Sequence, residues 1–186
     1  MPQKQVVLDL LYETFRDNPA SVGVVKQDSK IEKRFKLLLE YSYFLSKKQG
    51  NIYLTEDNTA CCLTIDSKKK KISIAQFYWY FILAFRVIGL KKAPEVLRRM
   101  KTLNNSRPKE PHVYIWYIGV TKEQQGKGVG TALLKKIIAL NKNSPICLET
   151  TKPSNFPFYE KLGFHKQKTI EGLNYSFTPY LLKNHK

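Results

Sequence analysis

Acidic residues are scarce in this 186-residue chain, in which 15 aspartates and glutamates stand against 32 lysines and arginines and give a formal net charge of +17. Cysteine and histidine are also scarce, at three each, and no spacing among them is typical of a metal site. We therefore expect no metal and a reducing, cytoplasmic setting. A charge this large attracts polyanions, so nucleotides, nucleic acids and anionic surfaces are all candidate partners.

Long hydrophobic runs are absent as well. The most apolar segment, Phe77 to Leu90, has about fourteen residues and contains Arg86, whereas a membrane span needs roughly twenty apolar residues. We interpret this segment as a buried or pocket-covering helix, and we expect no membrane partner. The basic residues are scattered except for the run Lys68–Lys71, which we interpret as a solvated turn, so a nucleic-acid partner remains open but is not favoured.

The length and the 42% hydrophobic content favour one domain spanning residues 1–186. Apolar spacing predicts helices ending near residue 17 and covering residues 31–48, then a hairpin of strands 52–55 and 60–65, then helices 77–90 and 94–103. Ser29 and Glu32 have capping-box spacing at the start of the second helix.

The second half of the chain predicts a βαβ unit. His112 to Val120 is typical of a central buried strand; a glycine-rich loop, a helix with an apolar stripe and a short strand over 146–149 follow. Gly126, Gly128 and Gly130 at the helix start would leave backbone N–H groups free for an anion, although a tight turn could use the same glycines for steric reasons. Their spacing fits neither a Walker loop nor a dinucleotide fingerprint.

Two ordered blocks carry a family resemblance. The segment Gln125-Gly126-Lys127-Gly128-Val129-Gly130, after a strand ending in Val120, resembles the Gln/Arg-x-x-Gly-x-Gly/Ala signature of the GNAT acetyltransferases. The segment from Asn155 to Phe164 resembles the Asn…Tyr-Glu-Lys-Leu-Gly-Phe block of the same family. The resemblance covers about residues 110–170. It implies a mixed α/β fold, with a central, mostly antiparallel sheet whose fourth and fifth strands are splayed, flanked by helices.

The resemblance also implies a function. We expect an N-acetyltransferase that moves acetyl from acetyl-CoA to a primary amine by direct attack in a ternary complex. The acceptor would be a small molecule or a peptide, and the protein a monomer or a homodimer. Residues 76–105 lie outside the family pattern, and we interpret them as a helical insertion near the acceptor site. The alternative is a catalytically silent module on the same fold that senses acyl-CoA or binds nucleic acid.

The family pattern assigns cofactor contacts and an acid to this chain. The cofactor contacts are Ile118, Val120, Gln125, Gly126, Lys127, Gly128, Gly130, Thr131 and Asn155. Tyr159 stands at the usual position of the general acid, with a core tyrosine as its plain structural alternative.

The candidates for the general base are Glu149 and His112, and water could also relay the proton. Each also has a structural interpretation, Glu149 as an ion-pair carboxylate and His112 as a polar residue at a strand edge. Cys147 lies in an apolar strand and is expected to pack rather than to act as a nucleophile.

Overall fold

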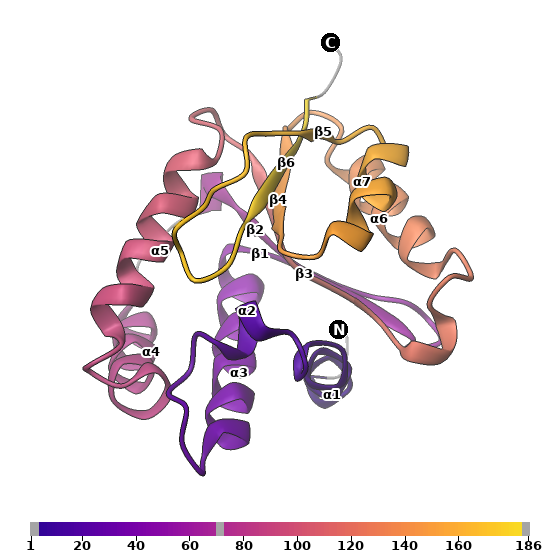
Figure 1. Ribbon diagram of the computed structural model, residues 1–186. Coiled ribbons are helices and arrows are strands. Elements are labelled where there is room, and N and C mark those ends of the chain that lie inside the picture. Colours follow the sequence, from indigo (N-terminus) through magenta and orange to yellow (C-terminus); the bar gives the residue numbers. More distant parts are fainter. Residues whose placement is uncertain (1–3, 70–72, 184–186) are drawn as a thin grey trace.

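The computed structural model describes residues 4–69 and 73–183. Its centre is a six-stranded sheet of order β1-β2-β3-β4-β6-β5 (Figure 1). The strands are β1 Gly50–Leu54, β2 Ala60–Asp66, β3 Val113–Val120, β4 Ile146–Thr150, β5 His165–Lys166 and β6 Thr178–Leu182. Neighbouring strands are antiparallel except β3 and β4, which are parallel. The mixed α/β class, the hairpin and the βαβ unit predicted from the sequence are confirmed.

Helices cover both faces of this sheet (Figure 1). The α-helices are α1 Lys4–Phe15, α2 Pro19–Val22, α3 Ile31–Gln49, α4 Ile74–Ile82, α5 Ala93–Ser106, α6 Val129–Leu140 and α7 Phe156–Lys161. A π-helical segment, η2 Leu83–Ile88, continues α4, and the short 3-10 turns are η1 Ser67–Lys69, η3 Lys122–Gln124 and η4 Pro153–Asn155. Helices α1 and α3 pack on one face of the sheet, and α6 and α7 pack on the other.

Strand β2 divides the two cores because its side chains alternate between the faces. Cys61 and Leu63 join the cluster formed with α1 and α3, whereas Ala60 and Cys62 join the cluster formed with α6 and α7. All four are fully buried. The sheet is therefore covered on both sides, which holds the strands that carry the candidate site in a rigid layer.

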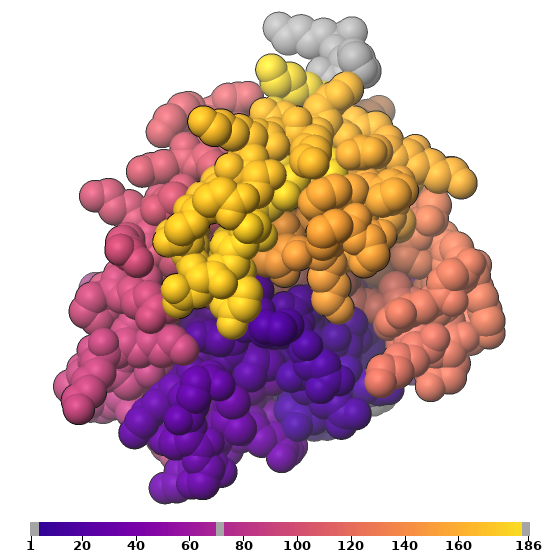
Figure 2. All heavy atoms as spheres, in the orientation of Figure 1, coloured from indigo at the N-terminus to yellow at the C-terminus, as the bar shows by residue number. Residues whose placement is uncertain are grey.

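The C-terminal segment packs against the N-terminal helices, as the contact of yellow and indigo segments in Figure 2 shows. A third apolar cluster joins Ala20 of α2 to Leu103, Leu173 and Phe177. Arg99 strengthens it, because its Nη2 donates to the carbonyl oxygen of Ala20 at 2.7 Å and its guanidinium lies 4.6 Å from the ring centroid of Phe177. Helix α5 is thus fixed to both ends of the chain.

Strands β3 and β4 pair only where both begin, at Val113 with Ile146 and at Tyr114 with Cys147. Beyond these pairs β3 runs away from β4 toward the glycine loop (Figure 1). The register between β2 and β3 shifts at Trp116, which places one extra residue in β3. Such a bulge bends the strand and increases its twist, consistent with the divergence of the two strands.

The predicted capping box does not form. Helix α3 starts at Ile31 as expected, but its N-cap residue is Lys30 and no side chain caps it. Glu32 instead pairs with Lys36 at 2.7 Å. The carboxylate of Asp28 accepts the N–H of Lys30 at 3.0 Å, so an acidic group still stabilises the positive end of the helix.

The aromatic segment is helical but exposed on one face, which corrects the expectation of a buried helix, whereas the alternative of a pocket-covering helix stays a prediction. The helix begins at Ile74 instead of Phe77. Gln76, Ile82 and Val87 face the protein, whereas large apolar side chains on the other face are exposed to solvent. The sequence of this segment is apolar on all sides of the helix, and such a pattern predicts burial. In the structure only one face of the helix packs against the rest of the protein.

The lysine run starts in an exposed 3-10 turn at Lys68 and Lys69, as a solvated turn requires. Lys70 and Lys71 lie outside the described residues.

Gly50 joins α3 directly to β1 and lies against the backbone of β2. A Cβ atom at this position would overlap the carbonyl oxygen of Thr64 and lie 2.9 Å from the Cα of Ile65. We predict that Gly50→Ala lowers the free energy of unfolding by about 2 kcal/mol or more, because backbone atoms must shift. Thermal unfolding should show a midpoint lower by roughly 4–8 °C. Asn51→Ala, at an exposed neighbour, is the control, and equal midpoints for the two variants would contradict the close packing.

Candidate active site

The edge of β3 that faces β4 has no strand partner near its carboxyl end. The N–H of Thr121 donates to the carbonyl oxygen of Thr59 at 2.9 Å, on the β2 side. Backbone groups alternate between the two edges along an antiparallel strand. The N–H groups of Ile118 and Val120 therefore point away from β2, into the opening between β3 and β4. These are the two positions that the sequence predicted for backbone contacts to a cofactor.

The glycine loop follows this edge directly and leads into α6. Gly126 and Gly128 have φ angles of +79° and +84°, a conformation that other residues adopt only with strain. Gly128 is the N-cap residue of α6, and nothing lies within 4 Å of a Cβ built on either glycine. The first N–H groups of an α-helix have no intrahelical acceptor and carry partial positive charge. The loop thus presents open, positively polarised backbone to solvent.

The remaining predicted loop residues lie around this surface. Gln125 donates from its side-chain amide to the carbonyl oxygen of Val120 at 3.0 Å, which ties the loop to the end of β3. A Cβ on Gly130 would lie 3.2 Å from the side chain of Val120, so this glycine allows α6 to start close to the strand. Lys127 is exposed, and Thr131 lies in the first turn of α6.

Tyr159 is buried in α7 at 5% exposure, on the sheet face that α6 covers. Its ring packs against Phe158, Phe164 and Tyr180. Burial raises the pKa of its phenol well above the usual value, and Cys62 adds to the rise. Because Cys62 pairs in register with Ile118, Tyr159 lies close to the strand with the open edge. The phenol stays protonated at neutral pH.

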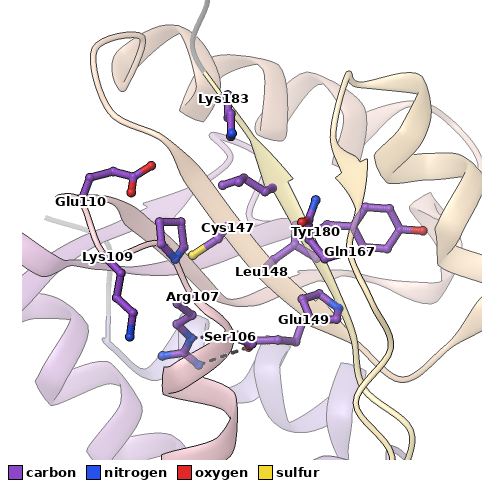
Figure 3. A pocket seen from close by; sticks show the side chains of 13 residues that line it. Ser106, Arg107, Lys109, Glu110, Cys147, Leu148, Glu149, Gln167, Tyr180 and Lys183 are labelled. Atoms are coloured by element: carbon purple, nitrogen blue, oxygen red, sulfur yellow. Dashed lines mark hydrogen bonds and ion pairs between the residues drawn. The ribbon is translucent and has the colours of Figure 1, made fainter.

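Glu149 of β4 is held by Arg107, which follows the end of α5 (Figure 3). The Nε of Arg107 donates to Oε1 at 2.8 Å and Nη2 donates to Oε2 at 3.2 Å, while the carboxylate side chain is only 4% exposed. The guanidinium lies 3.5 Å from the ring centroid of Tyr114. Burial opposes the charge of Arg107, but Tyr114 and Glu149 outweigh it and raise the pKa of the guanidinium. The group forms a bidentate ion pair stacked on an aromatic ring.

This ion pair lines a cavity of about 280 Å³ between the end of α5, β4 and β6. Lys109, Lys183 and Gln167 also line it. In Figure 3 the ring of Tyr180 points away from Arg107 and Glu149, toward the other face of the sheet. The cavity therefore belongs to the face opposite Tyr159.

Comparison with known proteins places this geometry in a family. Residues 96–166 match the family model described as an acetyltransferase (GNAT) domain. The chain contains a GNAT acetyltransferase domain. The matched range runs from within α5 through β3, the glycine loop, α6, β4 and α7, which are the elements that build the site.

Solved structures share the fold over nearly the whole chain. A protein from Corynebacterium glutamicum described as histone acetyltransferase HPA2 and related acetyltransferase is 19% identical, with 98% of this chain and 92% of that chain covered and a TM-score of 0.70. Arylalkylamine N-acetyltransferase 2 from Aedes aegypti is 14% identical, with 96% and 93% covered and a TM-score of 0.64. A polyamine N-acetyltransferase from Drosophila melanogaster is 12% identical, with 96% and 94% covered and a TM-score of 0.57. At these identities the likeness shows the GNAT fold.

The two candidate bases line different cavities, which share Arg107 and Lys109 among their lining residues. His112 precedes the first residue of β3, at the end of the strand remote from the glycine loop, and its Nδ1 lies 2.9 Å from the carbonyl oxygen of Glu110. It lines a second cavity, to which Glu149 does not contribute. Its predicted place within the strand is therefore corrected to the turn before it, whereas its role as a base stays a prediction.

Asn155 is the N-cap residue of α7, half-buried and one turn before Tyr159. That the two side chains share one face stays a prediction. Its contact with the cofactor stays a prediction.

Sequence reasoning missed Arg107 and Tyr114. Arg107 stands in a stretch read only as a helix break, and 42 positions separate it from the carboxylate that it holds. No local spacing signals such a pair, because the sheet alone brings the end of α5 beside β4. The buried carboxylate was visible as a candidate, but its partner was not.

Within residues 4–69 and 73–183, no group of three or more histidine, cysteine, aspartate or glutamate side chains is placed to hold a metal ion. No helix in the same ranges is long and apolar enough to cross a membrane.

We predict that Glu149→Gln lowers the free energy of unfolding by roughly 3 kcal/mol, because it leaves the charge of Arg107 without its anion in a mostly buried place. Removing both charges in Arg107→Gln/Glu149→Gln should restore most of that loss. Urea unfolding of wild type, both single variants and the double variant gives the coupling energy. Additive losses would contradict the ion pair.

Proposed function

We propose that this protein is an acetyl-CoA-dependent N-acetyltransferase that transfers acetyl to a primary amine by direct attack in a ternary complex. One observation carries the proposal: the open edge of β3 at Ile118 and Val120 is followed, after the short turn η3, by the positively polarised backbone of Gly126 and Gly128. A ligand that is amide-rich at one end and carries a pyrophosphate further along matches both parts. Acetyl-CoA has this order of groups.

The residues present fit such a ligand. Open space above Gly126 and Gly128 lets phosphate oxygens approach the backbone N–H groups, which a side chain would prevent. Lys127 adds a cation beside the loop, and the charge of +17 raises the rate of anion encounter. The amides of the pantetheine arm would pair with Ile118 and Val120 as an added strand, with Thr131 and Asn155 as further contacts.

The cosubstrate supplies an acetyl group activated as a thioester, and the chain supplies a hydrogen-bond donor and an acid. The N–H of Val120 points into the opening, where it would donate to the acyl oxygen as negative charge develops there. The phenol of Tyr159 is protonated at neutral pH, and burial raises its pKa further, so it would donate its proton to the departing sulfur. Attack by the amine nitrogen breaks the C–S bond and forms the amide.

The attacking amine must lose a proton, and Glu149 and His112 remain the proposed bases. Glu149 can accept a proton only by giving up part of its pairing with Arg107. We further propose a reducing, cytoplasmic setting, because the chain has three cysteines, an odd number that does not suit a disulfide framework.

We predict that Gly128→Glu weakens acetyl-CoA binding at least about tenfold, because it puts a bulky anion where the pyrophosphate must approach the helix start. Gly172→Glu is the matched control, since Gly172 also has a positive φ, +78°, and open space around its Cα. Isothermal titration of wild type and both variants with acetyl-CoA measures the change. Equal binding by all three proteins would overturn the cofactor site.

We predict that Tyr159→Phe lowers kcat roughly 10²- to 10³-fold through loss of the acid. Tyr180→Phe is the control, because Tyr180 packs on Tyr159 but its hydroxyl donates to Glu160 at 3.0 Å. Thiol release with a panel of primary amines gives the rates.

Because burial raises the pKa of the Tyr159 phenol, the phenol stays protonated at pH values where an exposed tyrosine begins to ionise. The rate of the wild-type protein should therefore not fall as the pH rises to about 10. Equal rates for both variants would remove Tyr159 from the mechanism, and cofactor binding without thiol release from any amine would favour a silent sensor.

A role of Glu149 as base predicts that Glu149→Gln lowers kcat/KM about 10²-fold or more while acetyl-CoA binding stays as in wild type. Rates and binding are measured below the unfolding temperature of that variant. An unchanged kcat/KM would assign Glu149 to the ion pair alone.

A further inference from the structure

A stripe of apolar side chains on α4 and η2 is exposed to solvent. We call it the aromatic stripe, and its members are Ile74, Phe77, Tyr78, Phe81 and Phe85, which are between 52% and 90% exposed. Their spacing puts them on one side of the helix, and the rings of Phe81 and Phe85 lie 4.5 Å apart between centroids. A cluster of this kind on a protein surface marks a place of interaction.

The fold does not need these side chains. The opposite side of the same helix supplies Ile82 and Val87, which are buried in the cluster formed with α1 and α3. Trp79, also on the inner side, packs against the rings of Tyr41 and Phe44 of α3. The helix is thus already anchored, and the aromatic stripe faces outward.

Cations surround the stripe but do not enter it. Between Ser67 and Ser106 the sequence has ten lysines and arginines and a single acidic residue, Glu95. Among the described cations, Lys68 and Lys69 precede the helix, and Arg86 and Lys91 follow the stripe, all four exposed. The carboxylate of Glu95 accepts a hydrogen bond from Asn174, so it turns toward the C-terminal segment. The result is a neutral aromatic centre with positive charge at both ends.

We propose that the aromatic stripe docks this protein on the surface of an anionic lipid bilayer. The uncharged rings would enter the boundary between headgroups and acyl chains, and the flanking lysines and arginines would contact anionic headgroups. The proposal is independent of the acetyltransferase activity. It also replaces the sequence expectation of no membrane partner, which rested on the absence of a span and not on the exposure of these side chains.

The charges favour a bilayer over two other occupants. A second copy of this chain would bring two molecules of charge +17 together with their cationic ends adjacent. A nucleic acid needs cations interleaved with the aromatic rings along its backbone, but no charged residue occurs from Ile74 to Phe85.

The position of the stripe suits this role. Helices α4 and α5 lie on one side of the molecule, and the glycine loop and α6 lie on the opposite side (Figure 1). Docking through α4 would leave the loop that is proposed to bind the cofactor open to solvent. Leu97 and Met100 on the outer face of α5 are also exposed and would widen the contact.

Vesicle flotation tests the proposal with the full chain at physiological salt. Vesicles of phosphatidylcholine with about 30% phosphatidylserine should carry the protein upward, and pure phosphatidylcholine vesicles should carry much less. Phe77→Ser/Phe81→Ser should lower binding roughly tenfold or more, because two exposed rings lose their apolar contact. Arg86→Glu/Lys91→Glu should lower binding to the anionic vesicles alone.

The matched control is Leu140→Ser, which removes a side chain that is 62% exposed at the end of α6, and it should bind as wild type does. Circular dichroism checks that every variant is folded. We expect all of them to fold, because the replaced side chains are exposed to solvent. Absence of binding to anionic vesicles, or equal binding by the double serine variant, would overturn the proposal. Two other results would also overturn it. One is a concentration-dependent dimer in analytical ultracentrifugation that Phe77→Ser/Phe81→Ser abolishes while vesicle binding is unchanged. The other is RNA binding that the same variant abolishes while vesicle binding is unchanged.

Discussion

The divergence of β3 from β4 is the constraint on which the candidate site depends. Two residue pairs hold the strands together at their starts, and everything beyond them is separated. Full pairing would direct the N–H groups of Ile118 and Val120 into a sheet and leave no edge for a ligand. The bulge at Trp116 accompanies this separation, and the rest of the sheet stays continuous because β2 and β6 flank the two strands.

The two cores keep this opening from closing. Helices α1 and α3 cover one face of β2 and β3, and α6 with α7 covers the other, so the open edge stands between packed layers. The glycine loop and Tyr159 both depend on the α6–α7 side. The ion pair of Arg107 with Glu149 belongs to the opposite face, where it joins α5 to β4. The same sheet thus presents positively polarised backbone at the glycine loop on one side and a polar cavity on the other.

The two proposals made above draw on different basic and aromatic residues. Backbone N–H groups with Lys127 form the surface proposed for a pyrophosphate, so most of the charge of +17 is not needed there. A large share of it lies near α4 and α5, around side chains that the core does not use. That distribution separates the proposed chemistry from the proposed attachment, and each can be lost without the other.

The sequence alone determined the fold class, the βαβ unit, the glycine loop and the position of Tyr159, because each rests on residues close together in the chain. The family resemblance carried by the same stretch named Ile118 and Val120 as cofactor contacts, and that role stays a prediction. Only the tertiary structure decided that the helix over 74–88 is exposed on one face, that His112 lies in the turn before β3 and that Asp28 stands in for the expected capping box. It alone paired Arg107 with Glu149, since that contact depends on where a helix end meets a distant strand. Periodicity reports which residues share a face, but the packing of the whole chain decides what that face meets.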